Sequence, residues 1–227
     1  MRHELARLAE VEMTSAMTTV GYRRLQRYVY RAEWSTPEVE HFIYFLLYGK
    51  PKNYLAADFG VRNKDAQAFA LRSIRKYGGE LYQLMRSDRA FHAPMRFPLG
   101  QVASWGARAS LKISAMSVAS LAERIASDIK LHLFVFIRDV TTLDRLLSFL
   151  LLDAEPCPWV RSNGAIRAAM IVYLAGRLDM RPSDIVSLLR PHKRSIASAL
   201  IKTPDPDPDS YVKKVLNDST RTLASLN

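Results

Sequence analysis

Capped amphipathic segments recur along the chain, and this pattern is the strongest constraint on its fold. An N-cap and first-turn proline, Thr36 and Pro37, precede an apolar run that ends at Tyr48, before Gly49. Apolar residues recur at three- and four-residue spacing in further segments, at residues 142–152, 166–178, 182–189, 193–202 and 212–226. We therefore expect an all-α protein of two helical lobes, each with a helix-turn-helix motif, joined by a helical middle region.

Two proline-bearing stretches indicate the domain boundaries. DRAFHAPMRFPLGQ has no helical period, and TPDPDPD should be extended and fairly stiff. The expected order is an N-terminal helical domain, a linker, a C-terminal helical domain and a tail with a terminal amphipathic helix, at residues 1–87, 88–101, 102–202 and 203–227. Residues 133–137, LFVFI, are a candidate buried strand, but they have no clear partner strand.

Positive charge is concentrated towards both ends of the chain. The sequence has 33 lysines and arginines against 22 acidic residues, a net charge of +11. The net charge is +5 over residues 1–90, +1 over 91–160 and +5 over 161–227. Such an excess points to a polyanionic partner, either nucleic acid or an anionic membrane surface. A membrane is disfavoured because neither basic region pairs its charge with an apolar face that the core does not need.

The residue patterns that support catalysis or metal binding are not found in this sequence. The single cysteine, Cys157, excludes an intrachain disulfide, and the five histidines show no metal-ligand spacing. We find no phosphate-binding glycine loop, nucleophile elbow or marked pair of acids. The N-terminus is too polar for a signal peptide, and no uncharged apolar run approaches the roughly 20 residues of a membrane span. We expect a cytoplasmic, nucleoid-associated protein that is not an enzyme, with no cofactor, metal, small-molecule substrate or membrane partner.

Residues 52–76, KNYLAADFGVRNKDAQAFALRSIRK, have the spacing of a helix-turn-helix. Gly60 suits the tight turn, and Ala56, four residues earlier, is the small residue needed where the two helices touch. Apolar residues occupy the inward positions, at Leu55, Phe59, Val61, Ala66 and Phe69. Asn63 is a suitable N-cap for the second helix, which we expect to end at the Gly78–Gly79 pair.

The outward side of this second helix is polar and basic. We expect its first part to read base edges in the major groove, through Arg62, Asn63, Lys64 and Gln67. We expect phosphate contacts from residues further along the helix, at Arg72, Arg75 and Lys76. The alternative is a purely structural helical hairpin, because compact hairpins reuse part of the same spacing.

The stretch GKPKNYLAADFGVRNKDAQAFALRSIRK (49–76) resembles the helix-turn-helix of the TrfB/KorA class of plasmid transcriptional repressors. The resemblance implies operator binding and repression of plasmid genes, with a homodimer as the binding form. It rests on the turn, the first helix and the recognition positions, at Gly49, Lys50, Pro51, Ala56, Gly60, Asn63, Lys64 and Gln67. It covers about an eighth of the chain, and those repressors are much shorter than 227 residues.

A second basic helical module is predicted over residues 165–202. Its spacing resembles the C-terminal DNA-binding helices of DnaA-type replication initiators, and winged-helix modules generally. Its last helix should present Lys193, Arg194, Ser195 and Ser198 to solvent as candidate DNA contacts. The sequence departs from the pattern at Arg190, where a glycine is usual, and at Val186, where a small residue is usual. The alternative is an ordinary helical subdomain with a basic rim.

Residues 22–34, YRRLQRYVYRAEW, interleave aromatic residues with arginines. Such a pattern can stack single-stranded bases and hold the nucleic-acid backbone. More often the aromatic side chains are the packed face of a helix and the arginines are its solvated face.

These observations predict a sequence-specific double-stranded DNA-binding protein, a transcriptional regulator of plasmid or mobile-element genes. Its recognition helix would be residues 63–76, with a second reader in the C-terminal lobe. One alternative is a protein that coats nucleic acid without sequence preference, or a replication-initiation protein. Another is a protein–protein adaptor whose helix-turn-helix is only scaffold.

Overall fold

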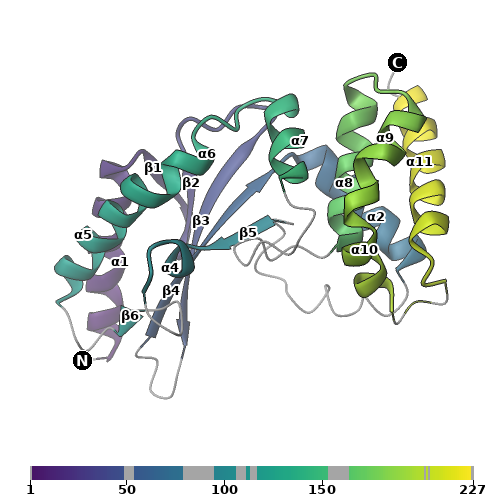
Figure 1. Cartoon of the computed structure of the whole chain (residues 1–227). Coiled ribbons are helices and arrows are strands. Elements are labelled where there is room, and N and C mark those ends of the chain that lie inside the picture. The colour runs from purple at the N-terminus through teal and green to yellow at the C-terminus, as the bar shows by residue number, and fades with distance from the viewer. Residues whose placement is uncertain are drawn as a thin grey trace. The chain divides into compact units, whose positions relative to one another are not determined.

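The computed structural model describes residues 2–48, 54–78, 95–105, 111–112, 117–152, 164–201, 203 and 205–225. Both helices and strands are present (Figure 1), so the all-α prediction is wrong. The chain divides into two compact units, each made of two separate segments. Unit 1 comprises residues 1–61 and 96–141, and unit 2 comprises residues 62–95 and 142–227.

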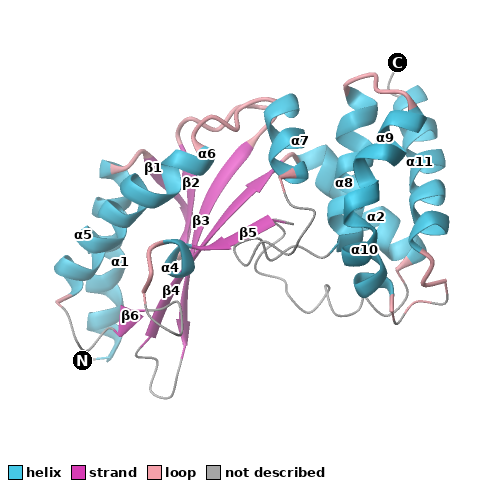
Figure 2. Ribbon diagram, viewed as in Figure 1, coloured by secondary structure: helices cyan, strands magenta, loops and turns pink. Residues whose placement is uncertain are grey.

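Unit 1 is built on a six-stranded sheet with the order β1-β2-β3-β4-β5, in which β6 also pairs with β4 (Figure 2). The strands are β1 (Tyr22–Gln26), β2 (Val29–Ala32), β3 (Glu40–Tyr48), β4 (Tyr54–Arg62), β5 (Met95–Pro98) and β6 (Leu111–Lys112). The pairs β1–β2, β2–β3 and β4–β6 are antiparallel. Helices α1 (Arg2–Thr19) and α5 (Val118–Asp128) pack against each other, and α4 (Leu99–Val102) is a single short turn.

Two of the predicted helices are strands, and the first of these strands is β3. Residues 41–45 of β3 are all buried, so both faces of the strand are covered and the sequence shows no two-residue alternation. Thr36 does act as a cap, because its hydroxyl accepts the Val39 N–H at 2.9 Å. The chain nevertheless leaves this turn as a strand and not as a helix, since aromatic and branched residues favour a buried sheet.

The candidate strand at residues 133–137 is helical. A π-helical turn, η2 (Ile129–Leu133), follows α5 directly and continues into α6 (Phe134–Ile137). Ile129, Leu133 and Ile137 are buried and lie four residues apart, which fits the inward side of a helix.

An aromatic cluster fills the core of unit 1. The Tyr22 ring packs edge-on against Trp34, with 4.9 Å between centroids, and against Phe59 at 6.5 Å. Trp34 also meets Phe134 edge-on at 5.2 Å. His41 lies within the cluster, 6.1 Å from both Trp34 and Phe59. Its Nε2–H donates to the carbonyl of Val140 at 2.7 Å, which ties β3 to the end of the α6 segment.

Unit 2 is a helical bundle around one central helix. Its elements are α2 (Lys64–Tyr77), α7 (Leu143–Leu151), α8 (Gly164–Arg177), α9 (Pro182–Leu189), the 3-10 turn η3 (Arg190–His192), α10 (Lys193–Leu200) and α11 (Pro208–Ala224). Residues 164–175 of α8 are all buried, and most of them are apolar. The buried Arg167 donates to the carbonyl of Leu150 at 2.7 Å. Helices α2, α7, α9, α10 and α11 each contact α8.

The helices predicted from caps and apolar spacing in this unit are confirmed. Asn63 caps α2 as predicted, and Thr142 caps α7. Pro182 occupies the first turn of α9. Asp207 caps α11, where its carboxylate accepts the Ser210 N–H at 3.0 Å.

The observed units differ from the consecutive domains expected at residues 1–87, 102–202 and 203–227. The chain passes from unit 1 into unit 2 after Val61, returns at Arg96 and leaves again after Thr141. Part of the expected linker at 88–101 is regular structure, since β5 and α4 begin within it. The remainder of that linker lies outside the described residues.

Candidate nucleic-acid interface

Helix α2 has one buried face and one charged face. Its buried residues are Ala66, Gln67, Phe69, Ala70, Ser73 and Ile74. Phe69 stacks on Tyr173 of α8, with ring centroids 5.2 Å apart. The charges along α2 also suit the helix dipole, because Asp65 lies in the first turn and Arg75 and Lys76 lie in the last. The cap and the charges therefore account for the helix, and packing on α8 decides which face it buries.

A basic stripe follows the exposed side of α2. It consists of Lys64, Arg72, Arg75 and Lys76, whose residues are all exposed. At 100° per residue, these four positions fall within an arc of roughly 120°, along about 18 Å of helix. Apart from Asp65 in the first turn, no acidic residue lies on this helix. The cations therefore lie towards the two ends of the stripe, with Lys64 next to Asp65 in the first turn and Arg72, Arg75 and Lys76 in the last turns.

The C-terminal end of the stripe is held by α11. Lys76 Nζ forms an ion pair with Asp218 at 2.9 Å, and the Tyr77 hydroxyl donates to the same carboxylate at 2.7 Å. Hydrogen bonds to Tyr77 and Asp218 raise the pKa of Lys76. Burial opposes ionisation of Asp218, but the hydrogen bonds from Lys76 and Tyr77 outweigh it, and its pKa is lowered. Lys76 is therefore charged at neutral pH and its position is fixed.

Two predicted base-reading residues do not lie on the stripe. Asn63 is 8% exposed, and its side-chain oxygen accepts the Ala66 N–H at 2.8 Å as the helix cap. Gln67 is 6% exposed and belongs to the buried face of α2. Both side chains are therefore buried and do not lie outward, as the base-reading roles predicted for them require. Arg62, the last residue of β4, is half-buried, and Lys64 is exposed in the first turn of α2.

The first helix of the predicted helix-turn-helix is strand β4. Leu55, Ala57, Phe59 and Val61 are all buried, which is the two-residue alternation of a strand. The four-residue step from Leu55 to Phe59 fits this alternation as well as a helical turn, so the spacing was ambiguous. Ala56 and Gly60, which carry the resemblance to the TrfB/KorA class, are strand residues, and residues 49–53 lie outside the described part of the chain.

The second predicted module does contain two helices joined by a turn. Arg190 in that turn has φ −53°, so the connection is right-handed throughout and needs no glycine. Arg194 and Ser198 are exposed one turn apart on α10. Lys193 is also exposed, but its Nζ pairs with Asp209 at 2.7 Å. Ser195 was predicted to face solvent, but it is half-buried against the start of α8.

The aspartates of the TPDPDPD segment reduce the positive charge next to α10. Asp205 pairs with Lys214 at 2.6 Å, and hydrogen bonds from Lys214 and Ser210 lower the pKa of Asp205 to about 2. With Asp209 on Lys193, these acids neutralise cations of α10 and α11. Each helix thus has one cation paired with an aspartate of this C-terminal region, Lys76 on α2 and Lys193 on α10. The positive surface is better developed on α2, which has three further exposed cations, at Lys64, Arg72 and Arg75.

The described residues contain no group of three or more histidines, cysteines or acids that could hold a metal ion. Cys157 lies outside the described residues. Within the described part of the chain, none of the helices has the length and apolarity required to cross a bilayer. No family model, curated protein or solved structure matches this chain.

Proposed function

We propose that this protein binds nucleic acid through the sugar–phosphate backbone, with the basic stripe of α2 as the contact surface. The supporting observation is the division of α2 into two faces. The amide side chains that could read bases, Asn63 and Gln67, are buried, whereas the cations are exposed. The net charge of +11 favours the same class of partner.

The stripe provides two kinds of phosphate ligand. The guanidinium groups of Arg72 and Arg75 can each bind two phosphate oxygens at once. Lys76 offers a point charge whose position is set by Asp218 and Tyr77. Such contacts carry no base information, so the binding should depend strongly on salt and weakly on sequence.

The salt dependence of DNA binding tests this proposal. The full chain is titrated into labelled random-sequence duplexes of about 20 base pairs while fluorescence anisotropy is followed at several salt concentrations. For four engaged phosphates, the slope of log K against log salt should be about −3.6. The double variant R72Q/R75Q should reduce that slope by about 2.

A matched control separates the stripe from overall charge. R177Q/R190Q removes the same charge from exposed arginines elsewhere in unit 2. The control should keep nearly the wild-type slope, because it lowers the net charge of the protein without removing a cation of the stripe. Equal losses in the two double variants would show that the stripe is not the contact surface.

A sequence-specific regulator of double-stranded DNA is the second candidate function. Arg194 and Ser198 favour it, since they are exposed one turn apart on α10 and can reach base edges. Selecting bound fragments from random genomic DNA distinguishes the two candidates. A regulator should enrich one site by about 10³ over other DNA, and R194Q/S198A should abolish the enrichment. Binding as a homodimer, and a nucleoid-associated location, remain predictions of this candidate.

A further inference from the structure

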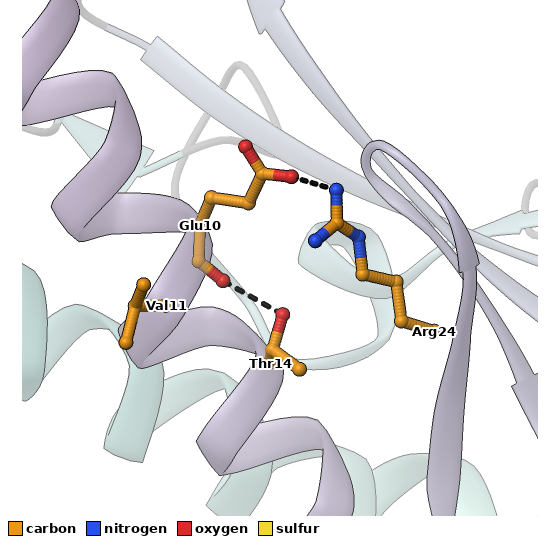
Figure 3. A pocket seen from close by; sticks show the side chains of 4 residues that line it. All are labelled: Glu10, Val11, Thr14 and Arg24. Carbon is orange, nitrogen blue, oxygen red and sulfur yellow. Dashed lines mark hydrogen bonds and ion pairs between the residues drawn. The ribbon is translucent and has the colours of Figure 1, made fainter.

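A small pocket lies in unit 1 where α1 passes the β1–β2 hairpin (Figure 3). Its volume is about 340 Å³, and its lining residues are Glu10, Val11, Thr14 and Arg24. Glu10 and Thr14 are one helical turn apart on α1, so they share a face. Arg24 of β1 is paired across the hairpin with Tyr30 of β2. Two helix residues therefore face two neighbouring strand residues.

Hydrogen bonds fix one side of this pocket. The Thr14 hydroxyl donates to the carbonyl of Glu10 at 2.7 Å. It lies 3.0 Å from the Tyr30 hydroxyl, which therefore donates to Thr14. This pair anchors α1 to β2 and holds the Glu10 side chain beside the hairpin.

Glu10 holds two arginines at once. One carboxylate oxygen pairs with Arg24, and the other lies 3.6 Å from Arg27 Nε. The Arg27 guanidinium also lies 5.0 Å from the centre of the Tyr28 ring and donates to the Tyr28 hydroxyl at 3.3 Å. One anionic group thus bridges two guanidinium groups, as a phosphate does when it binds an arginine pair.

The hairpin backbone presents these arginines in an unusual way. Tyr28 adopts φ 63°, a left-handed conformation that is rare for a bulky residue. The strand register shifts between Arg24 and Gln26, which places a bulge next to the pocket. Strained turns and bulges of this kind are frequent beside binding sites.

The two arginines are accessible to a ligand in solvent, and Glu10 is much less so. The side chains of Arg24 and Arg27 are 43% and 62% exposed, whereas that of Glu10 is 16% exposed. The cations can therefore meet a ligand from solvent without unfolding of the hairpin. Glu10 lies beneath them and neutralises them from the protein side.

We propose that Arg24 and Arg27 form a binding site for a phosphate group, and that Glu10 is an internal competitor for it. The ligand's oxygens would replace the Glu10 oxygens on the two guanidinium groups, with Tyr28 beside them. The phosphate belongs either to a mononucleotide or to the backbone of a single-stranded nucleic acid. This site is separate from the stripe on α2 and does not depend on the proposed function.

Titrations of the full chain test the proposal, followed by calorimetry or by amide shifts of the hairpin. The probes are inorganic phosphate, adenosine monophosphate and an eight-residue oligothymidylate without terminal phosphates. We expect E10Q to bind phosphate about threefold to tenfold more tightly, because the competing charge is lost. R24Q should weaken binding at least tenfold, since half of the arginine pair is removed.

The neighbouring Arg23 provides a matched control. It lies on the same strand but on the opposite face, paired with Arg31, so R23Q should keep wild-type affinity. E10Q and R24Q break the same ion pair yet should act in opposite directions, so loss of stability cannot explain both results. If inorganic phosphate and adenosine monophosphate bind and the oligothymidylate does not, the ligand is the phosphate of a mononucleotide. If the oligothymidylate binds more tightly, the ligand is the nucleic-acid backbone. No binding of any probe by E10Q, or equal weakening by R23Q and R24Q, would overturn the proposal.

Discussion

Acidification should destabilise unit 1 through His41. This residue is 0% exposed, and burial lowers its pKa from 6.5 to about 4, although the bond to Val140 acts in the opposite direction. A second proton would have to go to Nδ1, which has no hydrogen-bond partner among the described residues. Between pH 6.5 and pH 4 the unfolded chain therefore binds more protons than the folded chain. Stability falls as the pH is lowered through this window and is fully retained above it.

The size of this loss follows from the two pKa values. Between pH 7 and pH 5, a shift from 6.5 to about 4 corresponds to about 2 kcal/mol of unfolding free energy. His192 of unit 2 has a pKa lowered to about 4 by burial and by the nearby Arg167, so the same loss is expected there. The depressed pKa values of Asp205 and Asp218 act at lower pH, because both groups are still ionised at pH 5.

Urea denaturation at a series of pH values measures the effect, with probes assigned to each unit. Trp34 packs on Tyr22 in unit 1, and tryptophan fluorescence reports on this unit in a W159F background, because the two remaining tryptophans, Trp34 and Trp105, both belong to unit 1. The variant H41Q keeps an N–H donor for Val140 but cannot titrate, so it should lose about 2 kcal/mol less than wild type between pH 7 and pH 5. H192Q should leave the unit 1 transition unchanged. An H41Q protein with the wild-type pH dependence would refute the assignment, whatever its stability at pH 7.

Three further predictions concern the helical bundle and can be checked by thermal or chemical denaturation. Phe69→Ala should destabilise unit 2 by about 3–5 kcal/mol, since this buried ring packs on α8. Gly164→Ala should cost more than Gly176→Ala, because a Cβ at 164 overlaps the Ser195 backbone carbonyl, whereas at 176 it lies 2.7 Å from the end of the Leu223 side chain, which can change rotamer. Asn63→Ala should cost about 1 kcal/mol through loss of the α2 cap, and it should leave DNA affinity unchanged, because its side chain is buried in the cap.

The helices of unit 2 could be predicted from sequence, because each combines a local cap with apolar spacing. The sheet could not, since the sequence signals for its strands were ambiguous. Leu55 and Phe59 satisfy both a strand and a helical turn, and the buried run of β3 has no alternation. Local signals predicted helices where the tertiary environment selects the strands β3 and β4.

The candidate surfaces could also be predicted from the sequence only in part. The cations Arg72, Arg75 and Lys76 were predicted to lie outward, and they do, because charged side chains are rarely buried. Gln67 could not be placed from sequence, since its burial depends on how α2 packs in the bundle. The pocket at Glu10 was also out of reach, because it requires α1 and the hairpin to meet. The aromatic residues Tyr22 and Tyr30 are packed inward, as the alternative for residues 22–34 proposed, but on strands.

The interleaving of the two units affects how the chain can fold during synthesis. Helix α2 leaves the ribosome early, but its partner α8 begins at residue 164. Until then the apolar side of α2, with Phe69 and Ile74, has no native surface to cover it. Nascent chains that stop between residues 78 and 164 should therefore depend on chaperones. Truncation after Thr141 keeps every residue of unit 1 but removes α8, so the fragment should aggregate through the uncovered apolar face of α2.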